Sequence, residues 1–228
     1  MKGGDATVKV KILINLLLIL VCFTPLIGSF CGTVDSAYAG PEIFMMRKVA
    51  SGGGSQAAAY AGANINSSTG AMVANNGTDT FYNVVAWNES FTCPGTGTRE
   101  IDEISTYSYV ANGTMQWRLY LYTGAGAFVG QTPATNISNT TVAWQTATTF
   151  QNKTGGALSP LTCTGGSSYI LAGSSSDYNV STPYGTASTN AQYNTSYHYD
   201  SNPSLDPLSG GSASSQNFGL RIHVKAVP

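Results

Sequence analysis

Charged side chains are scarce in this chain of 228 residues, in which Asp, Glu, Lys and Arg together make up only 9%. Ordinary soluble domains contain about 25%. The formal net charge is −1, and no cluster of Lys and Arg follows residue 39. This balance argues against a nucleic-acid partner and against electrostatic binding to anionic membranes. The polar surface must instead come from Ser, Thr, Asn, Gln and Gly.

Histidine is also scarce, with two residues in the chain. His198 lies in an aromatic segment before Asp200, and His223 alternates with apolar residues near the C-terminus, so it is expected to face solvent. No serine lies in a Gly-x-Ser-x-Gly elbow, the turn that exposes a nucleophile in many hydrolases. We therefore predict a non-enzymatic protein with no catalytic residues.

Acidic residues form one short cluster, at Glu100, Asp102 and Glu103. On a strand, Glu100 and Asp102 would share one face and Glu103 would lie opposite. A solvated strand edge beside Arg99 is the simplest interpretation, whereas a glycosidase would need a positioned pair of carboxylates. We predict no cofactor. A structural Ca²⁺ site is the open alternative, either here or at Asp200, Asn202 and Asp206, which lack EF-hand spacing.

Cysteine is limited to four residues, of which Cys22 and Cys31 precede residue 39. That leaves Cys93 and Cys163 as a pair. Two cysteines without a histidine at ligand spacing are too few for a zinc site. In an oxidising compartment they are expected to form a disulfide that closes a loop of about 70 residues.

The N-terminal segment 1–39 has the pattern of a secretory signal peptide. Basic residues precede the apolar run Ile12 to Phe23, and Ala37-Tyr38-Ala39 is a small-x-small cleavage pattern before Gly40. We predict cleavage after Ala39, and hence an extracellular protein, secreted or on the cell surface, with no membrane contact afterwards. The apolar stretch to Phe30 approaches the length that spans a bilayer, so an uncleaved anchor is the alternative.

The residues after the leader divide into a short arm and one domain. Residues 40–55 comprise an apolar segment followed by the flexible linker Ser51 to Ser55. Residues 56–228 show alternating apolar and polar positions between Gly- and Asn-rich turns, most clearly at Met115 to Tyr122 and at Phe218 to Ala226. No stretch shows a helical period. We predict one all-β domain, an antiparallel β-sandwich of the jelly-roll type.

Part of this domain resembles a known module. The strand Met115 to Tyr122 before Thr123-Gly124, the Val142-Ala143-Trp144 strand and the Tyr169 to Ala172 strand after Gly165-Gly166 carry the likeness. Over Ile101 to Gly173 the chain resembles jelly-roll β-sandwich modules of secreted and surface microbial proteins, related in shape to carbohydrate-binding domains. The resemblance implies a fold and an extracellular role in adhesion or sugar binding, and it implies no site residues.

Sugar attachment is one way to cover a surface so poor in charge. Nine Asn-x-Ser/Thr triplets occur, some of which arise by chance in a chain rich in these residues. The predicted glycosylation sites are Asn66, Asn76, Asn88, Asn112, Asn136, Asn139, Asn152, Asn179 and Asn194.

Tyrosines gather in a polar, strand-poor region near the C-terminus. An exposed aromatic ring stacks on the apolar face of a pyranose, while neighbouring Asn and Asp side chains can bond its hydroxyls. The same rings could instead pack over a sandwich edge with wet hydroxyls. The candidate sugar-binding residues are Tyr178, Tyr184, Tyr193, Tyr197 and Tyr199.

The arm offers a different function. A short apolar segment on a flexible tether can add as a strand to the sheet of a neighbouring copy, and such a head-to-tail contact builds a filament. The predicted donor-strand residues are Ile43, Phe44, Met45, Met46 and Val49. We predict a structural subunit that forms a homopolymeric filament or surface coat. A carbohydrate-binding or adhesion module is the alternative.

Overall fold

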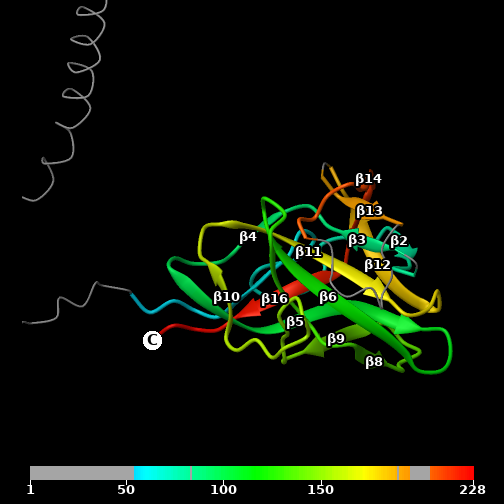
Figure 1. Ribbon diagram of the computed structural model, residues 1–228, viewed down its shortest axis with the longest axis horizontal. Coiled ribbons are helices and arrows are strands. Elements are labelled where there is room, and N and C mark those ends of the chain that lie inside the picture. The colour runs from blue at the N-terminus through cyan, green and yellow to red at the C-terminus, as the bar shows by residue number, and fades with distance from the viewer. Residues whose placement is uncertain (1–53, 83, 189, 196–205) are drawn as a thin grey trace, which may run out of the picture. The chain divides into compact units, whose positions relative to one another are not determined.

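The computed structural model describes residues 54–82, 84–188, 190–195 and 206–228 (Figure 1). Every regular element within these ranges is a β-strand, and all ladders between the named strands are antiparallel. The predicted all-β antiparallel sandwich is thus confirmed. The leader and the donor-strand residues 43–49 lie outside the described residues. All described residues belong to one compact unit, which runs from Ala50 to Pro228. Among the residues described, no helix is long and apolar enough to cross a membrane.

Sixteen strands form two sheets of eight strands each. The first sheet contains β1 (Ala59–Ala61), β2 (Gly77–Asp79), β5 (Thr98–Val110), β9 (Ala143–Ala147), β10 (Leu161–Thr164), β12 (Val180–Thr186), β15 (Gln216–Phe218) and β16 (Leu220–Val224). The second contains β3 (Val85–Trp87), β4 (Phe91–Thr92), β6 (Met115–Thr123), β7 (Phe128–Gln131), β8 (Thr135–Ile137), β11 (Ser168–Ser175), β13 (Gln192–Asn194) and β14 (Ser212–Ala213).

The hydrophobic core lies between the sheets. Trp117, Leu119 and Leu121 on β6 are fully buried, as the alternating pattern predicts, and so are Leu220 and Ile222 on β16. Successive side chains of a strand point to opposite faces, so every second residue of each strand packs against the opposite sheet. The apolar pattern of β16 extends to Ala226 in the sequence, yet the strand ends at Val224 and Ala226 is exposed.

The second sheet is covered on its outer face as well, which the sequence pattern does not predict. The alternating pattern of β6 places Tyr120 and Tyr122 on the face opposite Leu119 and Leu121, where solvent is expected, but both are buried in a second apolar cluster with Trp87. Leu208 packs on this cluster. The chain then passes so close at Gly211 that an added Cβ would lie 2.3 Å from the Trp87 ring. Residues 206–211 therefore form a partial third layer.

A β-bulge changes the faces of β5. The register between β5 and β16 shifts between His223 and Val224, so that Asp102 is an extra residue opposite β16. The core positions are consequently Ile101 and Ile104, three residues apart. Such a bulge turns two consecutive side chains to one side. The prediction that Glu103 lies opposite Asp102 is therefore wrong, because both carboxylates reach partners on the outer face of β16.

The predicted disulfide between Cys93 and Cys163 is confirmed, with the two Cα atoms 6.3 Å apart. Cys93 follows β4 of the second sheet and Cys163 lies in β10 of the first, so the bond connects the two sheets. Both sulfurs belong to the hydrophobic core.

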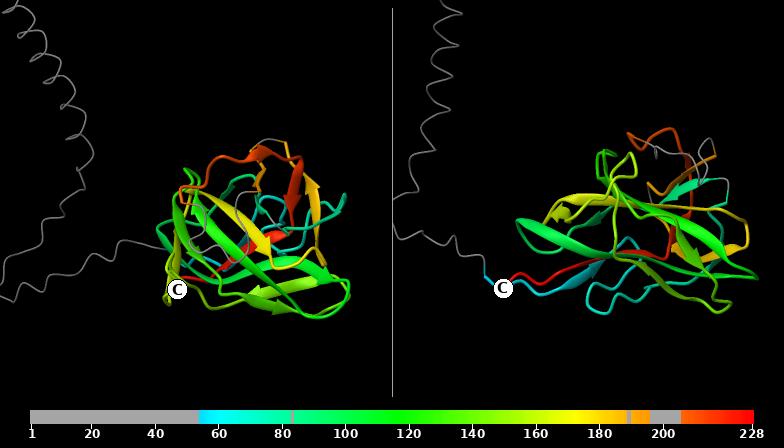
Figure 2. Two further views of the ribbon diagram at one scale, coloured as in Figure 1. Left: turned by 45° about the vertical axis from the view of Figure 1, so that its right-hand side comes forward. Right: turned by 60° about the horizontal axis from the view of Figure 1, so that its bottom comes forward.

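The two ends of the described chain lie side by side. The backbone N–H of Gln56 donates to Val227 O at 2.8 Å, and Val227 N donates back to Gln56 O at 2.9 Å. Figure 2 shows the same juxtaposition, with the first described residues in blue beside the red C-terminal segment. The described chain therefore begins and ends at the same end of the sandwich.

Candidate functional site

A cleft of about 410 Å³ opens between the two sheets at one edge of the sandwich. The second sheet contributes β3 and β13, and the first sheet contributes β2 and β15. The lining residues are Asp79, Thr80, Tyr82, Val84, Ala86, Tyr193, Ser214, Gln216 and Phe218. These come from three separate stretches of the chain, so only the fold brings them together.

Strand register places the aromatic walls of the cleft. Tyr193 on β13 lies opposite Ala86 on β3, and Ala86 is a core residue. Tyr193 therefore points to the inner side of the sheet. It lies one strand in from the edge strand β14, and 37% of it stays exposed. Phe218 forms the floor, packed against Phe81 with ring centroids 4.6 Å apart.

Polar groups at the mouth of the cleft are held in position. The Asp79 Oδ2 atom accepts a hydrogen bond of 2.8 Å from Gln216 Nε2, which joins β2 to β15. Its other oxygen accepts one from the backbone N–H of Thr80, also at 2.8 Å. Asp79 is the one charged residue of the lining. A carboxylate and an amide fixed in this way can accept from and donate to the hydroxyls of a ligand.

Exposed tyrosines concentrate around this cleft. Tyr178 is 65% exposed, Tyr82 39% and Tyr193 37%, and within the described chain only Val73 and Val142 are comparable large exposed apolar residues. The rings of Tyr82 and Tyr178 meet edge to face with centroids 6.1 Å apart. Tyr82 therefore links Tyr178 to the cleft that Tyr193 lines.

The predicted sugar-binding tyrosines have different locations. Tyr178 and Tyr193 lie at or beside the cleft, whereas Tyr184 is half-buried and its ring packs against Phe218 with centroids 6.1 Å apart. Tyr197 and Tyr199 lie outside the described residues. Sequence reasoning missed Tyr82, since it stands in an apolar segment about 100 residues earlier. No local signal marks it, because its role depends on the contact of its ring with that of Tyr178.

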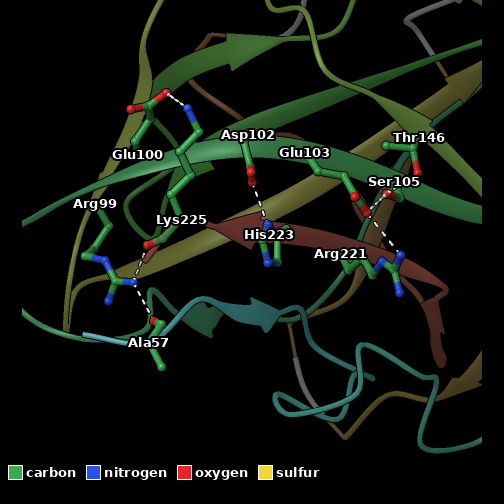
Figure 3. A network of polar contacts seen from close by, with 10 residues as sticks. All are labelled: Ala57, Arg99, Glu100, Asp102, Glu103, Ser105, Thr146, Arg221, His223 and Lys225. Carbon is green, nitrogen blue, oxygen red and sulfur yellow. Dashed lines mark hydrogen bonds and ion pairs between the residues drawn. The ribbon is translucent and has the colours of Figure 1, made fainter. Parts of the chain in front are cut away.

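The predicted acidic cluster lies elsewhere, on the outer face of the first sheet, where β5 and β16 carry a row of ion pairs (Figure 3). Glu100 pairs with Lys225, Asp102 Oδ1 lies 2.6 Å from His223 Nδ1, and Glu103 Oε1 lies 3.0 Å from an Arg221 nitrogen. His223 does lie on the outer face, as expected, although Asp102 and the Tyr60 ring partly cover it.

Arg221 is the most enclosed member of this row. Its guanidinium carbon lies 4.3 Å from the centre of the Tyr60 ring and 3.9 Å from that of Trp144, within the range of a cation–π contact. It also donates to Gly70 O at 2.8 Å. Arg221 therefore connects the loop between β1 and β2 to the first sheet. We interpret this row of charged pairs as stabilising the fold and not as binding a ligand.

The calcium alternative gains no support from this geometry. The three acidic side chains are each paired with a base, and no group of three metal-ligating residues occurs in the part of the chain that the structure describes. At the second candidate, Asp200 and Asn202 lie outside the described residues, and Asp206 pairs with Lys153 at 3.0 Å.

Two ion pairs at the surface, Lys153–Asp206 and Lys225–Glu100, each shift the pKa of one of their residues. The pKa of Asp206 is lowered, first by the hydrogen bond from the Lys153 side chain and then by the backbone N–H of Phe128. The pKa of Lys225 is raised, mainly by its hydrogen bond to Glu100. Both shifts favour the charged forms, so these pairs persist at neutral pH.

The predicted glycosylation sites differ in whether the side-chain nitrogen is available. Asn88 is 1% exposed, its Nδ2 donates to Phe218 O at 2.9 Å, and its Oδ1 accepts from Phe218 N at 2.7 Å. A glycan on that nitrogen cannot be accommodated in this fold, so the prediction for Asn88 is corrected. The other eight sites are exposed or half-buried.

Comparison with protein-family models, with curated proteins and with solved structures finds no match to this chain. The likeness of Ile101 to Gly173 to surface jelly-roll modules therefore stays a prediction, and function must be argued from the residues alone.

Proposed function

We propose that this chain is a non-enzymatic extracellular protein whose sandwich binds carbohydrate at the tyrosine cleft. The observation that carries this proposal is the convergence of Tyr82, Tyr178 and Tyr193 at one opening, beside the fixed Asp79–Gln216 pair. Exposed aromatic rings beside oriented polar groups are what a pyranose needs, because its faces are apolar and its edges carry hydroxyls.

The negative charge of the cleft restricts the sugars that it can bind. Asp79 is the one charged side chain in the cleft lining, and its carboxylate has no basic partner there. An anionic sugar would meet this carboxylate at close range, which is unfavourable in a partly enclosed cleft. We therefore propose neutral or amino sugars as ligands, and we expect uronic or sulfated sugars to be rejected.

Two features support export. The leader has the pattern of a signal peptide, and the Cys93–Cys163 disulfide is of a kind that persists in oxidising compartments. The low content of charged residues also suits a surface covered by glycans.

The first test measures ligand affinity after the tyrosine rings that line the cleft are removed. Replacement of Tyr82 and Tyr193 by alanine is expected to weaken binding of a neutral glycan by about tenfold or more, because stacking contributes about 1 kcal/mol or more per ring. Calorimetric titration with hits from a glycan array measures the change. Tyr82→Phe, which keeps the ring, should retain most of the affinity.

Tyr109→Ala provides the control, since Tyr109 lies on β5 and does not line the cleft. Its affinity should equal that of the wild type. Absence of any neutral ligand from a broad array, or binding unaffected by the double change, would refute a carbohydrate function for this cleft.

The second candidate function is that of a subunit in a filament or surface coat. The open sheet edge at β9 favours this function. Within the described residues β9 pairs with β5 alone, so the backbone groups along its other edge have no strand partner. An unpaired edge of this kind accepts an added strand. The apolar residues Ile43 to Val49 of a neighbouring copy are the proposed donor.

Deletion of Pro41 to Ser51 tests the strand-donation model. We expect the deleted protein to be monomeric, whereas the full exported chain forms polymers visible by negative-stain microscopy. A variant in which the same segment is replaced by Gly and Ser at equal length should behave like the deletion. Polymers that survive both changes would exclude this mechanism, and glycan binding should persist in either variant.

A further inference from the structure

Strand β5 defines two opposite ends of the sandwich. It contains 13 residues, and a rise of about 3.3 Å per residue separates its ends by roughly 40 Å. Thr98 stands at one end, close to the disulfide and to the paired residues Gln56 and Val227. Val110 stands at the other end, where the chain turns into β6.

Several glycosylation triplets from distant parts of the sequence meet at the Val110 end. The N–H of Val110 donates to Asn139 O at 2.8 Å, and Asn112 follows two residues later in the turn. Asn136 lies opposite Gln116 in the ladder between β8 and β6, and its Oδ1 accepts from that glutamine at 3.0 Å. The fold thus gathers Asn112, Asn136 and Asn139 around one turn.

An N-linked glycan is attached to the asparagine side-chain nitrogen. The nine triplets fall into two groups, according to whether this nitrogen already donates a hydrogen bond within the fold. At four positions this nitrogen already donates within the fold: Asn76 to Thr186, Asn88 to Phe218, Asn179 to Asp177, and Asn194 to Ser209 and Gly210. At the other five the described residues show no such bond. These five are Asn66, Asn112, Asn136, Asn139 and Asn152.

The three triplets at the Val110 end are also accessible. Asn112 and Asn136 are exposed and Asn139 is half-buried. Residues 111–114 are all exposed, and Gly113 has a φ of 73°, which suits a tight turn that projects from the strands. A large modification therefore fits at this turn without displacing core residues.

The opposite end has no such triplet in its own loops, although Ser67 of the Asn66 triplet lines a pocket with Pro94 and Gly166 beside them. Its loops are Pro94–Gly97 and Gly165–Ser167, which approach each other through the bond from Gly165 N to Gly97 O at 2.7 Å. Gln56 and Val227 lie beside them, since the Thr96 N–H donates to the Gln56 side chain at 2.8 Å. No Asn-x-Ser/Thr triplet falls within 54–60, 92–99, 161–168 or 220–228.

We propose that Asn112, Asn136 and Asn139 form a glycan-bearing end of the protein, opposite the end at which Gln56 pairs with Val227. In this modification the amide nitrogen bonds to the anomeric carbon of a lipid-phosphate-linked oligosaccharide. The bond from that carbon to the phosphate oxygen breaks, and the amide loses a proton.

Glycopeptide mass mapping of the chain exported by a host with an oligosaccharyltransferase tests this proposal. We expect glycan at two or more of the three positions and none at Asn88 or Asn194. Removing the hydroxyl of each triplet by Thr114→Ala, Ser138→Ala and Thr141→Ala keeps the asparagines, and it should lower the mass by the glycans lost while the protein stays folded.

Ser90→Ala is the matched control, because it abolishes the Asn88 triplet without touching the buried asparagine. It should leave the mass of attached glycan unchanged. Glycan on Asn88, or a Val110 end without glycan in this host, would overturn the proposal. Neither result bears on the tyrosine cleft, whose ligand binding is measured separately.

Discussion

Replacement of both Cys93 and Cys163 by alanine is expected to lower the free energy of unfolding by about 4 kcal/mol. The bond closes a sequence separation of 70 residues, and the entropy that a cross-link removes from the unfolded chain grows with the logarithm of loop length. Because the bond joins the residue after β4 of one sheet to β10 of the other, the closed loop contains strands of both sheets, including β5 and β9 of the first and β6 of the second. Urea unfolding followed by tryptophan fluorescence measures the loss.

Alanine suits this test better than serine, because both cysteines are buried and a hydroxyl would add an unsatisfied polar group. The wild type under a strong reductant should unfold at a urea concentration close to that of the double variant. Equal midpoints for the oxidised wild type and the variant would show that the disulfide does not stabilise the fold.

Replacement of Arg99 by methionine is expected to cost about 3 kcal/mol. Arg99 is 1% exposed, and its guanidinium donates to four acceptors: Gln56 Oε1 at 3.0 Å, Pro94 O at 3.1 Å, Ala57 O at 2.9 Å and Lys225 O at 2.7 Å. Figure 3 shows the two bonds to Ala57 and Lys225. Methionine fills similar space but leaves these acceptors without a donor, and buried acceptors that lose their donor are costly.

The same four bonds connect three chain segments at the end of the sandwich opposite Val110: the first described residues, the loop after Cys93 and the residue after β16. The Arg99 change should therefore also increase hydrogen exchange at residues 54–57 and 225–227. Arg99→Lys keeps the charge but not the planar fork of donors, so it should recover only part of the stability.

Lys153→Met is the matched control for the Arg99 change. Lys153 pairs with Asp206 at the surface, where such pairs contribute less than about 1 kcal/mol. Differential scanning calorimetry should show a clearly larger decrease in melting temperature for the Arg99 variant. Similar decreases for the two variants would refute a special role for the buried guanidinium.

The strands and the disulfide were predictable from the sequence for local reasons. Alternation at Met115 to Leu121 and at Phe218 to Val224 follows from the period of a strand, which depends on neighbouring residues only. The pairing of Cys93 with Cys163 followed from counting, because no other cysteine remains after the leader. The arm and the signal peptide stay predictions.

The errors at Glu103, Tyr120 and Tyr122 have a common cause. The bulge at Asp102 exists only in the pairing of β5 with β16, and the burial of the two tyrosines depends on residues 206–211, which lie more than 80 positions later. Neither partner is visible in a local pattern. The cleft shows the same limit, since Tyr82 joins Tyr178 and Tyr193 only through strand register.

The sequence by itself determined the fold class, the inner face of the central strands, the Cys93–Cys163 disulfide and the scarcity of charge, since each depends on composition or on neighbouring residues. The tertiary structure decided which tyrosines share a cleft, which carboxylates pair with bases, and which asparagines keep a free side-chain nitrogen. Those outcomes depend on contacts between residues far apart in the chain, and strand register and the crossing of loops fix such contacts only once the two sheets have packed.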